Sequence, residues 1–119
     1  MGPEAEAGIY GGAREMMDSD IDSFLTYWYG IAEEMGVLHS TWSCFEGGQN
    51  ADAVGIEGRN LTLVYDEDRP VRIALPDNPT WRQLFVAADK LIGQSGDTDH
   101  IFIESFETKE SDVYLHTGS

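Results

Sequence analysis

One run of apolar residues at helical spacing constrains the fold of this chain more than any other feature. The run consists of Ile21, Phe24, Leu25, Trp28, Ile31, Ala32 and Met35. Because these residues recur at intervals of three and four, they line one face of an α-helix, and that face needs a core to pack against. Ser19 or Asp20 can cap the start of the helix, and Gly36 suits a left-handed residue just after its end. We therefore predict an amphipathic helix from about Ser19 to Met35.

A second helical pattern follows Pro79. Its apolar face comprises Trp81, Leu84, Phe85, Ala88, Leu91 and Ile92. We expect Asn78 as the N-cap residue and Pro79 at the first helical position, because proline lacks the N–H that this position leaves unpaired. The helix should end between Gly93 and Gly96. Its remaining polar residues, Arg82, Gln83, Asp89 and Lys90, are expected to lie mostly outside the core.

Segments rich in β-branched and aromatic residues lie between and after the helices. We expect strands at 37–45, 54–56, 61–65, 71–75, 100–106 and 113–117. The short segment at 54–56 would be an edge strand. Polar connections at 66–70 and 107–112 have hairpin length, so the strands on either side of each should pair.

The resulting order, α-β-(β)-β-β-α-β-β, predicts an α+β fold. Hairpin connections favour an antiparallel sheet of four or five strands with both helices on one face. Residues 1–17 contain small and acidic residues without a sustained period and are interpreted as a flexible N-terminal arm. Residues 18–119 have the size of a single domain.

The charge of the chain limits its partners. It has 22 acidic and 7 basic residues, a formal net charge of -15 and one cysteine. Nucleic acid and anionic membranes need basic surface, so neither is an expected direct partner. No apolar run is long enough for a bilayer, and the first residues do not resemble a signal peptide, so the expected location is cytoplasmic. The acidity serves either solubility, as in a salt-adapted or mobile-element protein, or a basic partner.

The polar cluster Asp97, Asp99 and His100 is the densest group that could carry chemistry. Two carboxylates and an imidazole, with His116 as a further candidate, could bind a metal or transfer protons. The same residues are also typical of a turn that leads from a helix into a strand, and we favour that interpretation. Cys44 is interpreted as a core residue, because an alternating strand places its side chain on the face opposite His39. The sequence predicts no catalytic residue and no cofactor.

The first helix carries more aromatic surface than one buried face requires, since Tyr27 and Tyr29 flank Trp28, and tyrosine is common at protein interfaces. We therefore expect a non-catalytic adaptor, chaperone or inhibitor, a homodimer that binds a protein partner of basic character. Its expected contact residues are Asp22, Tyr27, Tyr29, Asp66, Glu67, Asp68, Asp97 and Asp99. Two alternatives remain open: a DNA mimic that inhibits a nucleic-acid-binding protein, and a small metal-dependent enzyme or ligand-binding protein using the Asp97 loop.

Overall fold

A computed structural model describes residues 18–66 and 70–119 of the chain, with the side chains of Asp18 and Ser19 excepted. The predicted arm at 1–17 and the acidic residues Glu67 and Asp68 lie outside this part. The elements are α1 (Asp18–Met35), β1 (Thr41–Trp42), the 3-10 turn η2 (Phe45–Gly47), β2 (Thr62–Asp66), β3 (Pro70–Ala74), α2 (Trp81–Ser95), β4 (Phe102–Lys109) and β5 (Asp112–Gly118). The predicted α+β class is confirmed.

The sheet is mixed, so the prediction of an antiparallel sheet is wrong. Its strand order is β1-β4-β5-β2-β3. Both predicted hairpins are present, since β2 pairs with β3 and β4 pairs with β5 in antiparallel register. The two hairpins meet where β2 runs parallel to β5, and β1 runs parallel to β4. Parallel neighbours require a crossover connection, and the long connection through α2 separates the two hairpins in the sequence.

Two of the predicted strands are much reduced. Of the segment 37–45, only Thr41 and Trp42 pair with a strand, and Val54 forms a single bridge to Thr80. The backbone N–H groups of Leu38 and His39 donate instead to the carboxylate of Asp89 on α2. A side chain therefore takes the hydrogen bonds that a neighbouring strand would have made.

The helix ends follow the predictions in part. Gly36 and Gly96 both have the positive φ of a left-handed residue after a helix, 71° and 79°. The N-cap of α2 is Thr80 rather than Asn78. The Thr80 hydroxyl accepts from the N–H of Gln83, whose side chain accepts from the N–H of Thr80. This reciprocal pair satisfies two helix-end donors, whereas Asn78 adopts a left-handed conformation before the helix begins.

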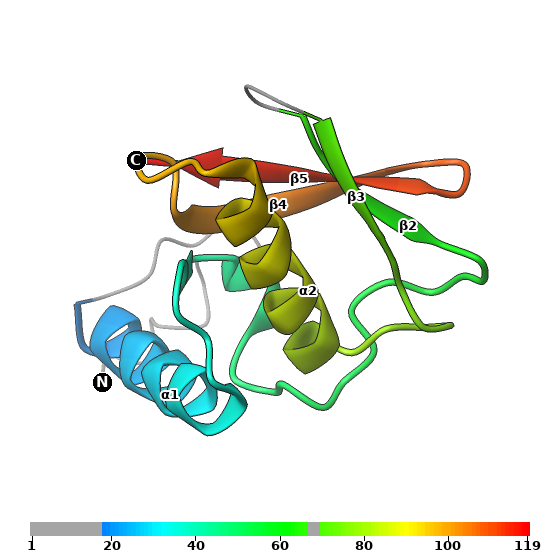
Figure 1. Cartoon of the computed structure of the whole chain (residues 1–119). Coiled ribbons are helices and arrows are strands. Elements are labelled where there is room, and N and C mark those ends of the chain that lie inside the picture. The colour runs from blue at the N-terminus through cyan, green and yellow to red at the C-terminus, as the bar shows by residue number, and fades with distance from the viewer. Residues whose placement is uncertain (1–17, 67–69) are drawn as a thin grey trace.

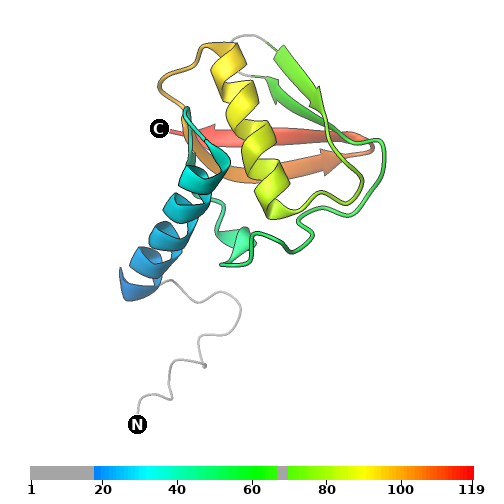
Figure 2. The same cartoon turned by 60° about the horizontal axis from the view of Figure 1, so that its bottom comes forward.

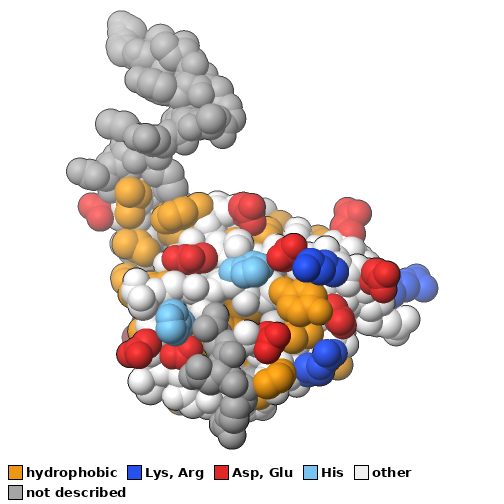
Figure 3. Space-filling view, turned by 90° about the horizontal axis from the view of Figure 1, so that it is seen from above, with side chains coloured by type: hydrophobic (Ala, Val, Ile, Leu, Met, Phe, Trp, Pro, Cys, Tyr) orange, Lys and Arg blue, Asp and Glu red, His pale blue; other side chains and the backbone are white. Residues whose placement is uncertain are grey.

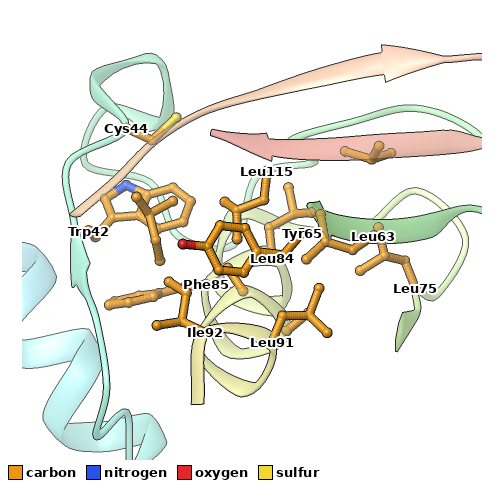
Figure 4. Packing of buried hydrophobic residues seen from close by; sticks show 14 of the residues in the cluster. Trp42, Cys44, Leu63, Tyr65, Leu75, Leu84, Phe85, Leu91, Ile92 and Leu115 are labelled. Atoms are coloured by element: carbon orange, nitrogen blue, oxygen red, sulfur yellow. The ribbon is translucent and has the colours of Figure 1, made fainter. Parts of the chain in front are cut away.

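Both helices lie on the same side of the sheet. Helix α2 crosses the strands, and α1 lies beside it near β1 (Figures 1 and 2). Between α2 and the sheet, Leu84, Phe85 and Leu91 meet Leu63 and other strand residues in the core that Figure 4 shows. An aromatic group extends this core towards α1, where Trp28 stacks on Trp42 with ring centroids 4.7 Å apart. No helix of the described residues is long and apolar enough to span a membrane.

The opposite face of the sheet is not covered by either helix, and Figure 3 looks onto it. Both signs of charge occur on it, and several of these side chains contact a partner of opposite sign. Arg72 lies 3.8 Å from Asp112, and Glu107 contacts both Lys109 and His116. Lys109 also lies 5.5 Å from the ring centre of Tyr114. Some of the acidic side chains on this face therefore have a cation or a histidine nearby, although Figure 3 shows more acidic than basic side chains on it.

Gly30 lies in the middle of α1 on its solvent side, and a Cβ atom added there would meet nothing within 4 Å. Gly30→Ala should therefore stabilise the protein by about 0.5–1 kcal/mol, because alanine loses less backbone entropy in a helix. Urea denaturation measures the change. Gly47→Ala is the matched control, since its Cβ would lie 3.3 Å from the Trp42 ring and should bring no gain. An unchanged stability of Gly30→Ala would contradict the prediction.

Candidate functional site

The solvent side of α1 carries a stripe of exposed residues, which we call the α1 stripe: Asp22, Thr26, Tyr29 and Glu33. Their spacing of three and four residues places them on one side of the helix. Tyr29 is 57% exposed. The carboxylates of Asp22 and Glu33 lie at opposite ends of the stripe, whose length at 1.5 Å per residue is about 16 Å. Helix α1 contains no lysine or arginine, so the tyrosine lies between two acidic groups in a surface without cations of its own.

A shallow hollow of about 420 Å³ lies beside the stripe. It is lined by Asp22, Ser23, Thr26, Tyr27 and Gln49. Tyr27 is half-buried, and its hydroxyl accepts a hydrogen bond of 2.9 Å from the N–H of Ala51. Asp22 and Tyr27, two of the predicted contact residues, thus line the same hollow, and Tyr27 also has a structural role. It fixes the 45–51 segment that forms the other wall of the hollow.

Contacts at the middle and near the C-terminal end of α1 hold the helix against the rest of the domain. The indole N–H of Trp28 donates to the carbonyl of Gly48 at 2.7 Å. Near the end of the helix, Arg82 of α2 lies 3.2 Å from Glu34 and 2.9 Å from Asp52. The partly buried guanidinium of Arg82 thereby joins α1 and the segment around Asp52 to α2. The α1 stripe is therefore presented by a fixed element rather than by a free helix.

Asp97 organises the loop between α2 and β4. One carboxylate oxygen accepts from the N–H groups of Asp99 and His100 at 2.8 and 3.0 Å. The other accepts from the Tyr65 hydroxyl at 2.9 Å and lies 3.1 Å from Nδ1 of His100. With 7% of its side chain exposed, Asp97 has little surface to offer a partner. These contacts are those of a turn that leads from a helix into a strand. Of the two predicted contact residues Asp97 and Asp99, only Asp99 is exposed.

These hydrogen bonds set the protonation of Asp97. The N–H groups of His100 and Asp99, followed by the Tyr65 hydroxyl, hold the pKa of Asp97 well below its ordinary value. A carboxyl whose pKa is lowered by folding stabilises the protein above its unfolded pKa of about 3.9. That contribution is lost as the pH falls below about 4 towards the folded pKa.

Asp97→Asn should therefore lower the thermal midpoint near neutral pH, and the difference from wild type should narrow as the pH falls below about 4. At low pH the carboxyl of Asp97 becomes protonated in the wild type. It then lacks the charge-assisted hydrogen bonds, as the side-chain amide of Asp97→Asn does at every pH. Thermal denaturation across a pH series measures both effects. Asp99→Asn is the control and should change the midpoint little. A difference that stays constant with pH would show that the charge of Asp97 is not responsible.

The residues of the metal hypothesis do not all converge. His116 lies on the open face of the sheet, where Nε2 is 3.0 Å from Glu107, whereas His100 contacts Asp97. Within residues 18–66 and 70–119 no three histidine, cysteine, aspartate or glutamate side chains form a group that could hold an ion. Asp66, at the end of β2, points to the open face, opposite to the direction of Tyr65. Asp66 therefore lies on the other side of the sheet from α1, and Glu67 and Asp68 lie outside the described residues.

Cys44 is completely buried beside Trp42, as Figure 4 shows. Burial, with a smaller contribution from the Glu46 carboxylate, raises the pKa of its thiol to about 11. The thiol is therefore protonated at neutral pH and unsuited to act as a nucleophile. The interpretation as a core residue is in agreement with this environment.

Asp89 is the buried acidic residue that the sequence analysis missed. Only 6% of it is exposed, although it was expected outside the core. Its carboxylate accepts from the N–H groups of Leu38 and His39 and from the hydroxyl of Ser40 at 2.7 Å. It thereby holds the loop after α1 against α2. One signal was available, since Asp89 follows the core residue Phe85 by one helical turn.

Comparisons with protein-family models, with curated proteins and with solved structures found no match to this chain. Its function is therefore inferred from the geometry of its own residues.

Proposed function

We propose that this chain is a non-catalytic protein-binding module that engages a basic segment of a partner protein through the α1 stripe. The observation that supports this most directly is Tyr29, which is exposed at the centre of a cation-free helix surface with a carboxylate at each end. Tyrosine offers a large apolar ring with a polar end, and such residues often dominate the energy of an interface. Carboxylates around it favour lysine and arginine on the partner and speed the encounter.

The neighbouring hollow gives the partner a place for one side chain. Asp22 belongs both to the stripe and to the wall of the hollow, so a lysine or arginine inserted there would meet its carboxylate. Phe45, which is exposed and packs on Phe24 with ring centroids 4.8 Å apart, adds apolar surface from the 45–51 segment. An amphipathic segment with basic residues about 16 Å apart would contact both ends of the stripe.

A labelled lysine-rich helical peptide is the probe for this proposal. Fluorescence anisotropy should show that a triple variant, Asp22→Asn, Tyr29→Ala and Glu33→Gln, binds it about tenfold or more weakly than wild type. The matched control, Glu57→Gln with Glu110→Gln, removes the same number of exposed charges elsewhere and should retain most of the binding. Amide shifts measured by NMR on adding the peptide should be largest on α1.

Two outcomes would oppose the proposal. Equal losses in the triple variant and the control would mean that overall charge, and not the α1 stripe, attracts the peptide. If neither the triple variant nor the control binds the peptide more weakly, the peptide binds at another surface. The DNA-mimic hypothesis stays a prediction, and the metal-dependent alternative is not supported by any convergence of ligands among the described residues.

A further inference from the structure

Strand β3 lies at the edge of the sheet and leaves one side of its backbone free. It pairs with β2 on its inner side, and no other described strand lies against its outer side. The N–H of Leu75 donates to the carbonyl of Leu61. By the alternation of an antiparallel ladder, residues 71, 73 and 75 face β2, whereas the N–H and C=O groups of Arg72 and Ala74 point outward. The opposite edge, β1, contains only two residues.

Two prolines delimit this free edge symmetrically. Pro70 and Pro76 each lie three residues from Ile73, and neither has an N–H to donate. If an identical strand lies antiparallel with a two-fold axis at Ile73, Arg72 of one copy faces Ala74 of the other. Each outward N–H then meets a carbonyl of the second copy. In this register the outward N–H groups of Arg72 and Ala74, which lie between the two prolines, both form hydrogen bonds.

The side chains of the edge are compatible with the same register. On the helix side of the sheet, Ile73 would meet Ile73 of the second copy and Val71 would meet Leu75. Both Ile73 and Val71 are only half-buried in the single chain, so they have apolar surface left to cover. On the open face Arg72 would lie opposite Ala74, which keeps the two guanidinium groups from facing each other.

The charge of the strand itself does not oppose contact between two acidic chains at this edge. The segment 70–76 contains Arg72 and no carboxylate, in a chain whose net charge is -15. Two copies that approach through β3 therefore avoid placing acidic side chains of this segment in direct contact. Their remaining long-range repulsion is screened by salt.

We propose that two copies of this chain associate through the free edge of β3, so that the sheet continues from one copy into the other about a two-fold axis at Ile73. This interface is separate from the α1 stripe and leaves it exposed in both copies. A dimer of this kind would present two α1 stripes to a partner, but its formation does not depend on the proposed function.

Sedimentation of the full chain over a range of concentrations tests the association. We expect a dimer whose dissociation constant falls as potassium chloride is raised. Ala74→Pro removes an outward N–H without removing a bond to β2, and edge positions tolerate proline. It should weaken the dimer about tenfold or more, since each copy loses one donor. The matched control, Ala74→Val, keeps the N–H and should still dimerise. Thermal midpoints verify that both variants are folded.

Cross-linking tests the register. Ile73→Cys should form a disulfide between copies under mild oxidation, because facing Cβ atoms in this kind of pair lie about 4.5–5.5 Å apart. Arg72→Cys should not, since Arg72 faces Ala74. The wild-type chain is the control, as its Cys44 is buried. A wild-type chain that stays monomeric at all concentrations and salts would overturn the proposal, as would a dimer that survives Ala74→Pro and fails to cross-link through position 73.

Discussion

Replacing Trp28 with alanine should lower the free energy of unfolding by about 4 kcal/mol, the largest single effect that we expect in this protein. Trp28 is 1% exposed and contacts four other aromatic rings. Alanine would leave a cavity between α1 and the core, and it would also remove the donor to the Gly48 carbonyl. Urea denaturation followed by circular dichroism measures the loss.

Trp28→Phe separates the two contributions of this residue. Phenylalanine keeps much of the ring packing but cannot donate to Gly48, so its cost should be clearly smaller than that of alanine. Tyr29→Ala, one position along the same helix, is exposed and should change stability by no more than about 0.5 kcal/mol. A small effect of Trp28→Ala would mean that α1 is held mainly by its other contacts, such as those of Arg82.

Asp89→Ala should destabilise the protein by about 3 kcal/mol, because it leaves the N–H groups of Leu38 and His39 and the Ser40 hydroxyl without their acceptor. Chemical denaturation measures the total cost. Amide hydrogen exchange should show faster exchange at Leu38 and His39 in particular, since these donors lose their protection.

Asp89→Asn tests whether the charge or the shape of the side chain matters. Asparagine keeps the size but replaces one acceptor oxygen with a donor, so it should recover only part of the loss. Lys90→Ala, at the exposed neighbouring position, serves as the control and should have little effect. If Leu38 and His39 exchange no faster in either Asp89 variant, the carboxylate does not hold this loop in solution.

The loop that Asp89 contacts also exposes an apolar side chain. Leu38 is 82% exposed, more than any other large hydrophobic residue in the described part of the chain, while its own N–H donates to Asp89. Next to it lies a hollow of about 390 Å³ that includes Gly93, where the His39 ring approaches the helix backbone closely. Loss of the Asp89 contacts would therefore free the backbone that carries this exposed apolar side chain.

The sequence predicted the helices and hairpins because their signals are local. The spacing of Phe24, Trp28 and Ile31 predicts a helix from neighbouring residues alone, and all three are buried. The polar connection 66–70 likewise predicts that its flanking strands pair. Such patterns depend on residues close together in the chain, and the structure confirms them.

The parallel seam and the Asp89 contacts depend on residues far apart in the sequence. Neither Thr62 nor Val113 carries a local signal that β2 will lie parallel to β5. Similarly, the apolar and β-branched run at 37–45 has the composition of a strand, but a carboxylate some fifty positions later accepts its hydrogen bonds. Of the α1 stripe, Asp22 and Tyr29 were among the expected contact residues, whereas Glu33 was not. Only the helix shows that Glu33 lies on the same side as Tyr29.

The mixed sheet also determines the order in which the fold can be completed during synthesis. The β2–β3 hairpin can form from neighbouring residues soon after it leaves the ribosome, because its contacts are local. However, β2 lacks its second neighbour until β5 has been made, and Thr41 of β1 waits for Phe102 of β4. A nascent chain that has reached α2 therefore carries unpaired strand edges on both sides of the growing sheet, and such edges promote aggregation. The late β4–β5 hairpin pairs with β2 and β1 and leaves only the outer edges of β3 and β1 among the described strands, and the strong negative charge of the chain would help to keep it soluble until then.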